Sequence, residues 1–184
     1  MRRIDNKTAL KIIYWNAVAA ILLVSLSAIS LLHRIHRFDR LIVETSRRFD
    51  VDPRLVSALI WRESRFDPNC VGTHQEVGLM QITEAAAREW ADTYDVSNFK
   101  RTDLFDPSTN IQAGTWYLAR AIRRWSDRPD PLPFALAEYN AGRSNAQRWA
   151  AESGASAKRF MEAVTYPSTR KYITTILTRY RGGV

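Results

Sequence analysis

The chain has 184 residues, 46% of them hydrophobic, and a formal net charge of +8 at pH 7. This length supports one domain with an appendage, and it is long enough to bury a core. The charge is uneven, because residues 39–184 hold 21 Lys and Arg against 18 Asp and Glu. That small surplus does not provide the basic surface that nucleic-acid binding needs, so we expect no nucleic-acid partner.

The N-terminal segment contains a long apolar run. Residues 12–32 are interrupted only by Asn16 and three serines, and a bilayer-spanning helix needs about 20 residues. We therefore predict a membrane anchor within residues 1–37. The alternative is a cleaved signal peptide, for which small residues near Ser27 would serve as the cleavage position. Basic residues, including Arg2, lie on both sides of the run, so charge does not fix its orientation.

Residues 38–184 are predicted to form one mainly α domain. Two Asp-Pro pairs, Asp52-Pro53 and Asp106-Pro107, combine an N-cap with a proline at the first helical position. Gly142 is suited to end a helix, and Ser144 begins a capping-box pattern for the next one. No long strand pattern is visible. The expected helices cover residues 38–49, the stretch from 53 to Glu63, 83–90, 107–125, 134–141, a segment after 144, 156–165, and a last stretch around 172–180, with loops at 91–103 and 127–133.

One carboxylate lies in an unusual position. Glu63 follows Leu59 by four residues and Leu55 by eight, so it continues the apolar stripe of its helix. Loss of water there disfavours the charged form and raises the pKa toward that of a general acid working at neutral pH. The alternative is an ordinary surface carboxylate, paired with Arg62 or Arg65.

The cysteine and histidine content argues against several other chemistries. Cys70 is the single cysteine, so an internal disulfide and a Cys-based zinc site are excluded. His74 is close in sequence and leaves a Cys-His nucleophile as an alternative to a plain loop thiol. His33 and His36 flank the apolar segment. We expect no metal and no cofactor.

Four sequence blocks occur in a fixed order in residues 50–180. They are Glu63-Ser64, Gly78-Leu79-Met80-Gln81-Ile82, Tyr139-Asn140-Ala141-Gly142 and Pro167-Ser168-Thr169-Arg170-Lys171-Tyr172. This combination resembles the lytic transglycosylase family, whose catalytic domain is related to goose-type lysozyme. The resemblance implies a lysozyme-like helical domain over residues 38–184, with a cleft between groups of helices.

The resemblance also implies a reaction and its residues. Glu63 would protonate the bond between N-acetylmuramic acid and N-acetylglucosamine in peptidoglycan, then act as a base on the C6 hydroxyl, leaving a 1,6-anhydromuramoyl end. Tyr139 would lie close to Glu63 and bond to it or to the reacting region. Met80 and Gln81 would line the sugar cleft. The remaining candidate substrate-binding residues are Ser64, Asn140, which also suits a structural role before Gly142, and Tyr172, which also suits the core.

The chain departs from the family pattern near the acid. Gly72 stands where many members have serine, and Gln75-Glu76 replaces a small Gly-Ala pair. Glu76 and Glu138 add carboxylates close to the motifs. Either is a candidate second catalytic group, although a solvated position is the ordinary explanation for both.

Three functions remain open at this point. The first is a lytic transglycosylase at the bacterial inner membrane, with its domain in the periplasm, or secreted there after cleavage. The second is a goose-type-lysozyme-like hydrolase of the same bond. The third is a non-catalytic peptidoglycan-binding or envelope-assembly module. The small size suggests service to an envelope-spanning secretion or conjugation machine.

Overall fold

The computed structural model describes residues 6–182. The chain divides into two compact units, Met1–Asp39 and Arg40–Val184. Arg2, one of the basic residues that precede the apolar run, lies outside the described residues. The assignment of residues 1–37 as an anchor and of residues 38–184 as a catalytic domain remains a prediction.

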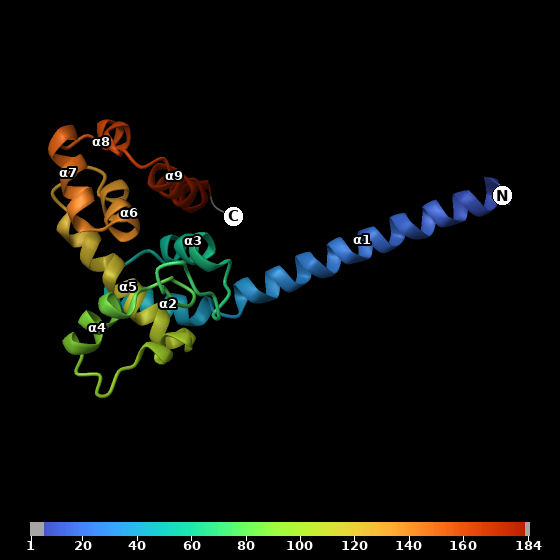
Figure 1. The fold of residues 1–184 in the computed structure, drawn as a ribbon, viewed down its shortest axis with the longest axis horizontal. Coiled ribbons are helices and arrows are strands. Elements are labelled where there is room, and N and C mark those ends of the chain that lie inside the picture. The colour runs from blue at the N-terminus through green and yellow to red at the C-terminus, as the bar shows by residue number, and fades with distance from the viewer. Residues whose placement is uncertain (1–5, 183–184) are drawn as a thin grey trace. The chain divides into compact units, whose positions relative to one another are not determined.

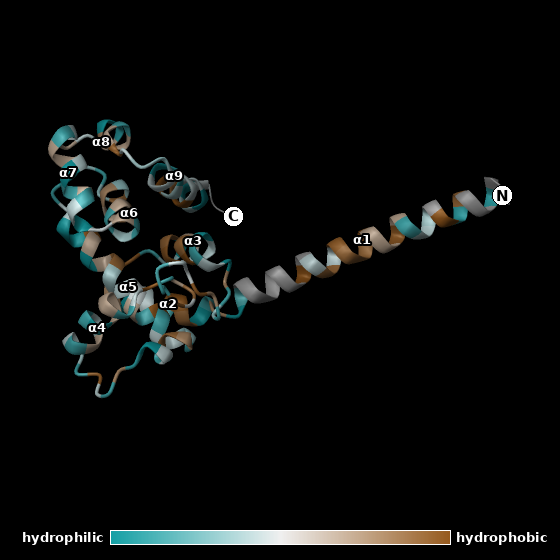
Figure 2. Cartoon of the chain, in the orientation of Figure 1, coloured by the Kyte–Doolittle hydropathy of each residue, from teal (hydrophilic) through white to brown (hydrophobic). Residues whose placement is uncertain are grey.

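The first unit consists mainly of α1 (Asn6–His36). Its stretch Leu10–Ser27 has a mean hydropathy of 1.7 and is long and apolar enough to cross a membrane. Figure 2 shows hydrophobic residues along the middle turns of this helix. Large apolar side chains such as Trp15 and Leu22 are exposed on it. Length and composition fit a membrane anchor, and they fit a signal sequence equally well.

The second unit is built of helices joined by loops (Figure 1). Between residues 6 and 182 the only β pairing is two isolated bridges, Val71 with Val77 and Val77 with Ile82. The mainly α class predicted from the sequence is therefore confirmed. Its elements are α2 (Asp39–Phe49), α3 (Pro53–Ser64), α4 (Glu84–Thr93), the 3-10 helix η1 (Arg101–Phe105), α5 (Pro107–Arg124), α6 (Leu132–Ala141), α7 (Arg143–Ser153), α8 (Ala157–Ala163) and α9 (Pro167–Gly182).

Both Asp-Pro helix starts are confirmed. The Asp52 side chain accepts the Arg54 backbone N–H at 2.8 Å, and Pro53 opens α3. Asp106 accepts the Thr109 backbone N–H at 2.8 Å at the start of α5. Each cap satisfies a backbone donor that the first turn of a helix leaves without an intrahelical partner.

Other boundaries differ from the prediction. The capping box at Ser144 is wrong: α7 already begins at Arg143, its N-cap is Gly142, and no side chain caps it. Gly142 has a φ of +84°, which lets one residue end α6 and begin α7. The expected loop at 91–103 is partly helical, because α4 runs to Thr93 and η1 starts at Arg101.

The core is organised around α5. This helix buries most of the residues along one side and packs against α4, η1 and α6, while α3 packs against α9 (Figure 1). Gly114 allows a close approach, since a Cβ there would lie 2.6 Å from Met80 Sδ and 2.7 Å from Met80 Cβ. Gly114 therefore lets α5 pack directly against the Gly78–Ile82 block.

Candidate active site

Glu63 lies in the last turn of α3, and its surroundings change its acidity. Removal from water raises the pKa of its carboxyl group to about 7, the largest of the effects on it. The helix ends immediately afterwards at Arg65, which has a left-handed φ of +55°. Arg62 and Arg65 are not ion-paired with Glu63 within the described part of the chain. Their guanidinium groups lie over the rings of Tyr172 and Trp61 instead.

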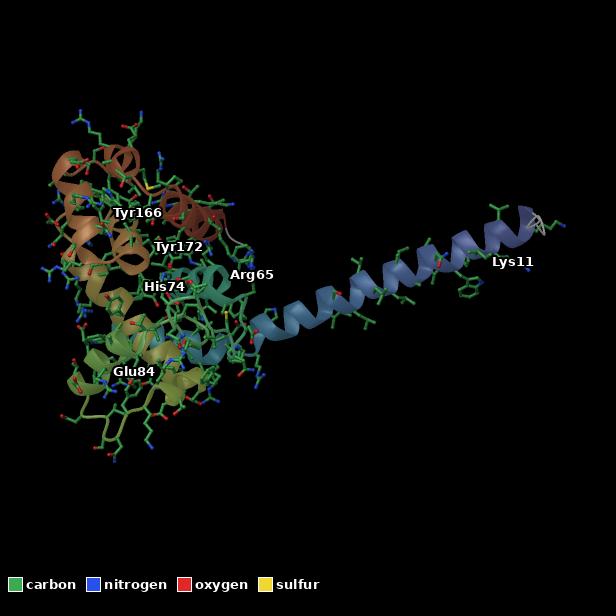
Figure 3. All side chains as sticks on the ribbon, viewed as in Figure 1. Lys11, Arg65, His74, Glu84, Tyr166 and Tyr172 are labelled. Carbon is green, nitrogen blue, oxygen red and sulfur yellow. The ribbon has the colours of Figure 1, made fainter. Side chains whose placement is uncertain are left out.

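Tyr172 is the direct partner of Glu63. Its hydroxyl donates to Glu63 Oε1 at 2.5 Å across the contact between α9 and α3, and Figure 3 shows Tyr172 directed from α9 toward α3. This bond lowers the pKa of Glu63, but burial outweighs it. The Tyr172 side chain is buried, and burial raises the pKa of its own hydroxyl well above the ordinary value. Tyr172 is therefore a proton donor in this hydrogen bond.

Tyr139 lies in the same region but has a different partner. Its hydroxyl donates to the Met80 carbonyl at 2.9 Å, and its ring meets Tyr117 edge to face. Burial raises the pKa of the Tyr139 hydroxyl, and the negative charge of Glu63 raises it further. The position close to Glu63 agrees with the sequence expectation, whereas the hydrogen bond to Glu63 comes from Tyr172.

Glu63 opens into a cleft of about 340 Å³. The cleft is formed by the end of α3, the loop that follows it, the start of α4, and parts of α5 and α6. Its lining residues are Glu63, Gly72, Thr73, Glu76, Gln81, Ile82, Thr83, Ala86, Tyr117, Glu138, Tyr139, Asn140 and Gly142. Polar groups from four segments thus converge on one half-buried acid, as expected of a ligand site.

Two residues assigned to the cleft from the sequence are packed in the interior instead. Met80 is fully buried against Gly114 and Thr115 and does not line the cleft. Ser64 is also buried, and its hydroxyl donates to the Leu79 carbonyl at 2.8 Å. Both predictions fail for the same reason: the Gly78–Ile82 block turns its apolar side toward α5 and α3, so these side chains fix the block.

Gln81 and Asn140 do line the cleft. The Gln81 amide Nε2 donates to the carbonyls of Cys70 at 3.0 Å and Gly78 at 2.9 Å. This leaves Oε1 as the group of Gln81 able to accept a bond from a ligand. Asn140 Oδ1 accepts the Thr169 hydroxyl at 2.8 Å, which ties the end of α6 to the first turn of α9.

Asn110 is an organising residue that the sequence reasoning missed. It is fully buried at the start of α5. Its Oδ1 accepts the Met80 N–H, and its Nδ2 donates to the carbonyls of Val77 and Leu104, each at 2.8 Å. Gly78, with a φ of +77°, is required beside it because a Cβ would lie 2.3 Å from Asn110 Nδ2. The signal available in the sequence was the position of this polar residue directly before Ile111, which is on the apolar face of the helix.

The extra carboxylates have two different environments. Glu138 is only 2% exposed; it is ion-paired with Arg124, and it accepts the Trp125 Nε1–H at 2.9 Å. The solvated position expected for Glu138 is therefore wrong, because Arg124 and Trp125 at the end of α5 replace water around it. Glu76 remains 25% exposed in the cleft wall and accepts the His74 backbone N–H at 2.8 Å.

Cys70 is not arranged as a nucleophile. Burial raises the pKa of its thiol, helped by the nearby Asp67 and Glu63, so the reactive thiolate is disfavoured. The His74 ring lies next to the Thr73 hydroxyl and the Glu76 carboxylate. Residues 6–182 contain no group of three or more His, Cys, Asp or Glu placed to hold a metal ion.

The fold and the cleft define a class of helical domain built around one partly desolvated acid, and comparison with known proteins places the chain within it. The sequence model described as Transglycosylase SLT domain matches residues 40–161. The chain belongs to this family, as the sequence resemblance predicted.

Curated relatives carry related names. The chain is similar to membrane-bound lytic murein transglycosylase F of Desulfosudis oleivorans, with 39% identity over 112 residues, 59% of this chain and 23% of the relative. It is also similar to membrane-bound lytic murein transglycosylase C of Klebsiella pneumoniae, with 32% identity over 121 residues, 62% of this chain and 34% of the relative. The chain thus spans about a quarter to a third of these relatives.

Solved structures show the same fold. The 70 kDa soluble lytic transglycosylase of Escherichia coli matches with a TM-score of 0.71 and 24% identity, over 79% of this chain and 24% of that one. An inactive mutant of lytic transglycosylase Slt from Pseudomonas aeruginosa matches with a TM-score of 0.69 and 21% identity, over 76% of this chain and 22% of that one. These matches confirm the predicted lysozyme-like helical fold.

Proposed function

We propose that the chain is a peptidoglycan lytic transglycosylase that uses Glu63 as its single general acid and base. The observation that carries the proposal is a half-buried carboxyl group with a pKa of about 7 in a cleft of about 340 Å³ that Gln81 and Asn140 also line. At neutral pH such a group is populated in both protonation states, so it is able to donate a proton and to take one back.

The reaction divides into two proton transfers. Protonated Glu63 gives its proton to the oxygen of the β-1,4 bond between N-acetylmuramic acid and N-acetylglucosamine, and the C1–O bond breaks. The acetamido group of the substrate stabilises the positive charge that develops at C1. Glu63, now ionised, takes the proton of the C6 hydroxyl, whose oxygen bonds to C1. A 1,6-anhydromuramoyl end results, water is not consumed, and Glu63 is restored.

Two tyrosines would support this cycle in different ways. Tyr172, bonded to Glu63 Oε1 at 2.5 Å, orients the carboxyl group and stabilises its ionised form, while leaving Oε2 to carry the proton. Tyr139 keeps the Gly78–Ile82 block in place through the Met80 carbonyl, and it forms part of the cleft wall. Gln81 and Asn140 are proposed to contact the sugar from the same cleft.

Hydrolysis of the same bond is the second candidate, and one observation favours it. Glu76 and Glu63 line the same cleft, and glycosidases that use water act through two carboxyl groups. In that reaction Glu76 would activate a water molecule at C1, and the product would be heavier by one water. A binding module without catalysis has less support, because binding alone does not require an acid with a raised pKa.

The partner and location are part of the proposal. The names of the curated relatives contain both "murein transglycosylase" and "membrane-bound", and α1 is long and apolar enough to anchor a protein. We propose that the domain acts on peptidoglycan strands in the periplasm while α1 holds it at the inner membrane. Service to an envelope-spanning secretion or conjugation machine is a proposal by analogy and rests on no residue of this chain.

The full chain in detergent micelles, incubated with purified sacculi, tests the proposal. Wild-type protein should release soluble muropeptides, and Glu63→Gln should release almost none while still sedimenting with sacculi. Glu152→Gln removes an exposed carboxylate on α7 and serves as the matched control. Equal release by the Glu63→Gln variant would show that Glu63 is not the catalytic acid.

A further inference from the structure

Glu76 stands in the wall of the Glu63 cleft and has no part in the proposed reaction. Its Oε2 accepts the His74 backbone N–H at 2.8 Å, and its Oε1 lies 3.4 Å from His74 Nδ1. The loop closes on itself as well, because the Gly72 N–H donates to the Glu76 carbonyl at 2.8 Å. The carboxylate is therefore held by the loop that carries it, whose residue His74 is labelled in Figure 3.

Gly72 provides the space that Glu76 fills. A Cβ added at Gly72 would lie 2.3 Å from Glu76 Oε2 and 2.8 Å from Gln81 Oε1. These separations are too short for any real side chain, so a residue larger than glycine would have to displace the Glu76 carboxylate. The two departures from the family pattern, a glycine at 72 and a glutamate at 76, thus form one structural unit.

We propose that Glu76 is a positioning residue for Glu63: its carboxylate enters the cleft through the space left by Gly72 and favours the acid form of Glu63. This inference deepens the proposed function and rests on it. Because both Glu76 oxygens face His74, we assign Glu76 a fixed electrostatic role and not a proton transfer.

The electrostatic balance at Glu63 supports this role. Two carboxyl groups in one site resist ionising together, and the charge of Glu76 raises the pKa of Glu63 in addition to burial. Arg62 and the Tyr172 hydroxyl act in the opposite direction. The charged and titratable groups around Glu63 are Arg62 on α3, Cys70 and Glu76 in the following loop, Tyr117 on α5, Glu138 and Tyr139 on α6, and Tyr172 on α9.

Among these groups Glu76 is the one whose removal should lower the pKa of Glu63 without changing its hydrogen bond. The Glu138 carboxylate is ion-paired with Arg124 and accepts a hydrogen bond from Trp125. Loss of either Tyr172 or Arg62 would raise the pKa. A fall in the pKa of Glu63 therefore identifies the effect of Glu76, whereas a rise identifies the effect of Tyr172 or Arg62.

The test is a pH titration of the Glu63 carboxyl carbon by ¹³C NMR, with the full chain in detergent micelles and labelled glutamate. The Glu63→Gln variant assigns the resonance. In Glu76→Gln, which keeps the size and removes the charge, the midpoint should fall by about half a unit or more. Glu152→Gln, which removes a remote exposed carboxylate, should leave the midpoint within about 0.2 unit of the wild type.

Gly72→Ser is the second variant. It keeps the carboxylates of Glu63 and Glu76 and changes the position of the Glu76 carboxylate. It should displace Glu76 and lower the Glu63 midpoint in the same direction. It also tests the proposal if Glu76→Gln does not fold, as judged by circular dichroism. A midpoint that is unchanged in a folded Glu76→Gln or Gly72→Ser variant would overturn the proposal.

The titration does not depend on turnover, so it separates this inference from the proposed function. Wild-type protein that yields no muropeptides would contradict the proposed function while leaving the coupling of Glu63 and Glu76 measurable. If wild-type protein releases hydrated products and Glu76→Gln abolishes them with no change in the Glu63 midpoint, Glu76 activates water, and the positioning role is wrong.

Discussion

Replacement of Tyr172 by phenylalanine should move the pH dependence of catalysis upward. The hydroxyl bonds Glu63 Oε1 at 2.5 Å and stabilises the ionised form. A hydrogen bond to a charged group contributes about 1.5–3 kcal/mol, and about 1.4 kcal/mol corresponds to one pKa unit. Tyr172→Phe should therefore raise the pKa of Glu63 from about 7 by about 1–2 units.

The assay is the rate of release of soluble muropeptides from sacculi, measured as kcat/KM between pH 5 and 9. In the wild type the rate should fall above pH 7 as Glu63 loses the proton that it must donate. In Tyr172→Phe this fall should occur at higher pH. Tyr139→Phe is the matched control, since its hydroxyl bonds the Met80 carbonyl and not Glu63. If the pH at which kcat/KM falls is unchanged or lower in Tyr172→Phe, Tyr172 does not stabilise the ionised form of Glu63.

Three further predictions concern stability. Glu63 ionises at a pKa of about 7 in the folded chain against 4.5 for a glutamate in water, so unfolding releases its proton between these pH values, and stability falls as pH rises through that window. Glu63→Gln should therefore raise Tm at pH 8 by more than at pH 5. In free energy of unfolding, the gain at pH 8 should exceed the gain at pH 5 by at most about 3 kcal/mol. Asn110→Ala should lower the free energy of unfolding in urea by about 3 kcal/mol or more, because it leaves the Met80 N–H and two buried carbonyls unpaired. Gly114→Ala should cost about 1–3 kcal/mol in the same assay and reduce activity, because its methyl group forces Met80 out of place.

Matched variants make these three results interpretable. Glu152→Gln should show no difference in Tm between the two pH values beyond that of the wild type. Asn145→Ala loses two hydrogen bonds, one to the Ala141 carbonyl at the end of α6 and an exposed one from Arg148, and should cost about 1 kcal/mol. Gly182→Ala meets no neighbour within 4 Å and should be neutral or slightly stabilising. A Glu63→Gln variant with equal gains at both pH values, or an Asn110→Ala variant as stable as Asn145→Ala, would contradict the corresponding account.

The sequence predicted well those features that depend on neighbouring residues. The starts of α3 and α5 follow from Asp-Pro pairs, in which the cap and the proline act within one turn. The position of Glu63 on the apolar face follows from its spacing to Leu59. The boundary of α7 was missed because Gly142 ends one helix and caps the next, so the pattern at Ser144 lies inside the helix.

Features that depend on contacts between distant segments were harder to predict. The sequence blocks predicted that Tyr139 and Tyr172 belong to the site. Which of the two hydroxyl groups bonds Glu63 depends on how α9 packs against α3. Met80 was expected in the cleft wall, and only the contact with Gly114 shows that it faces α5. Glu138 was expected in water because its partners Arg124 and Trp125 are more than ten residues away.

The central claim is that Glu63, acting as acid and then base, lets the C6 hydroxyl oxygen replace the leaving sugar at C1 of N-acetylmuramic acid, and mass spectrometry of the released muropeptides tests it most directly. The 184-residue chain in detergent should release products with 1,6-anhydromuramoyl ends, and Glu63→Gln should release none. Products heavier by one water, formed by the wild type, would contradict the claim and identify the reaction as hydrolysis.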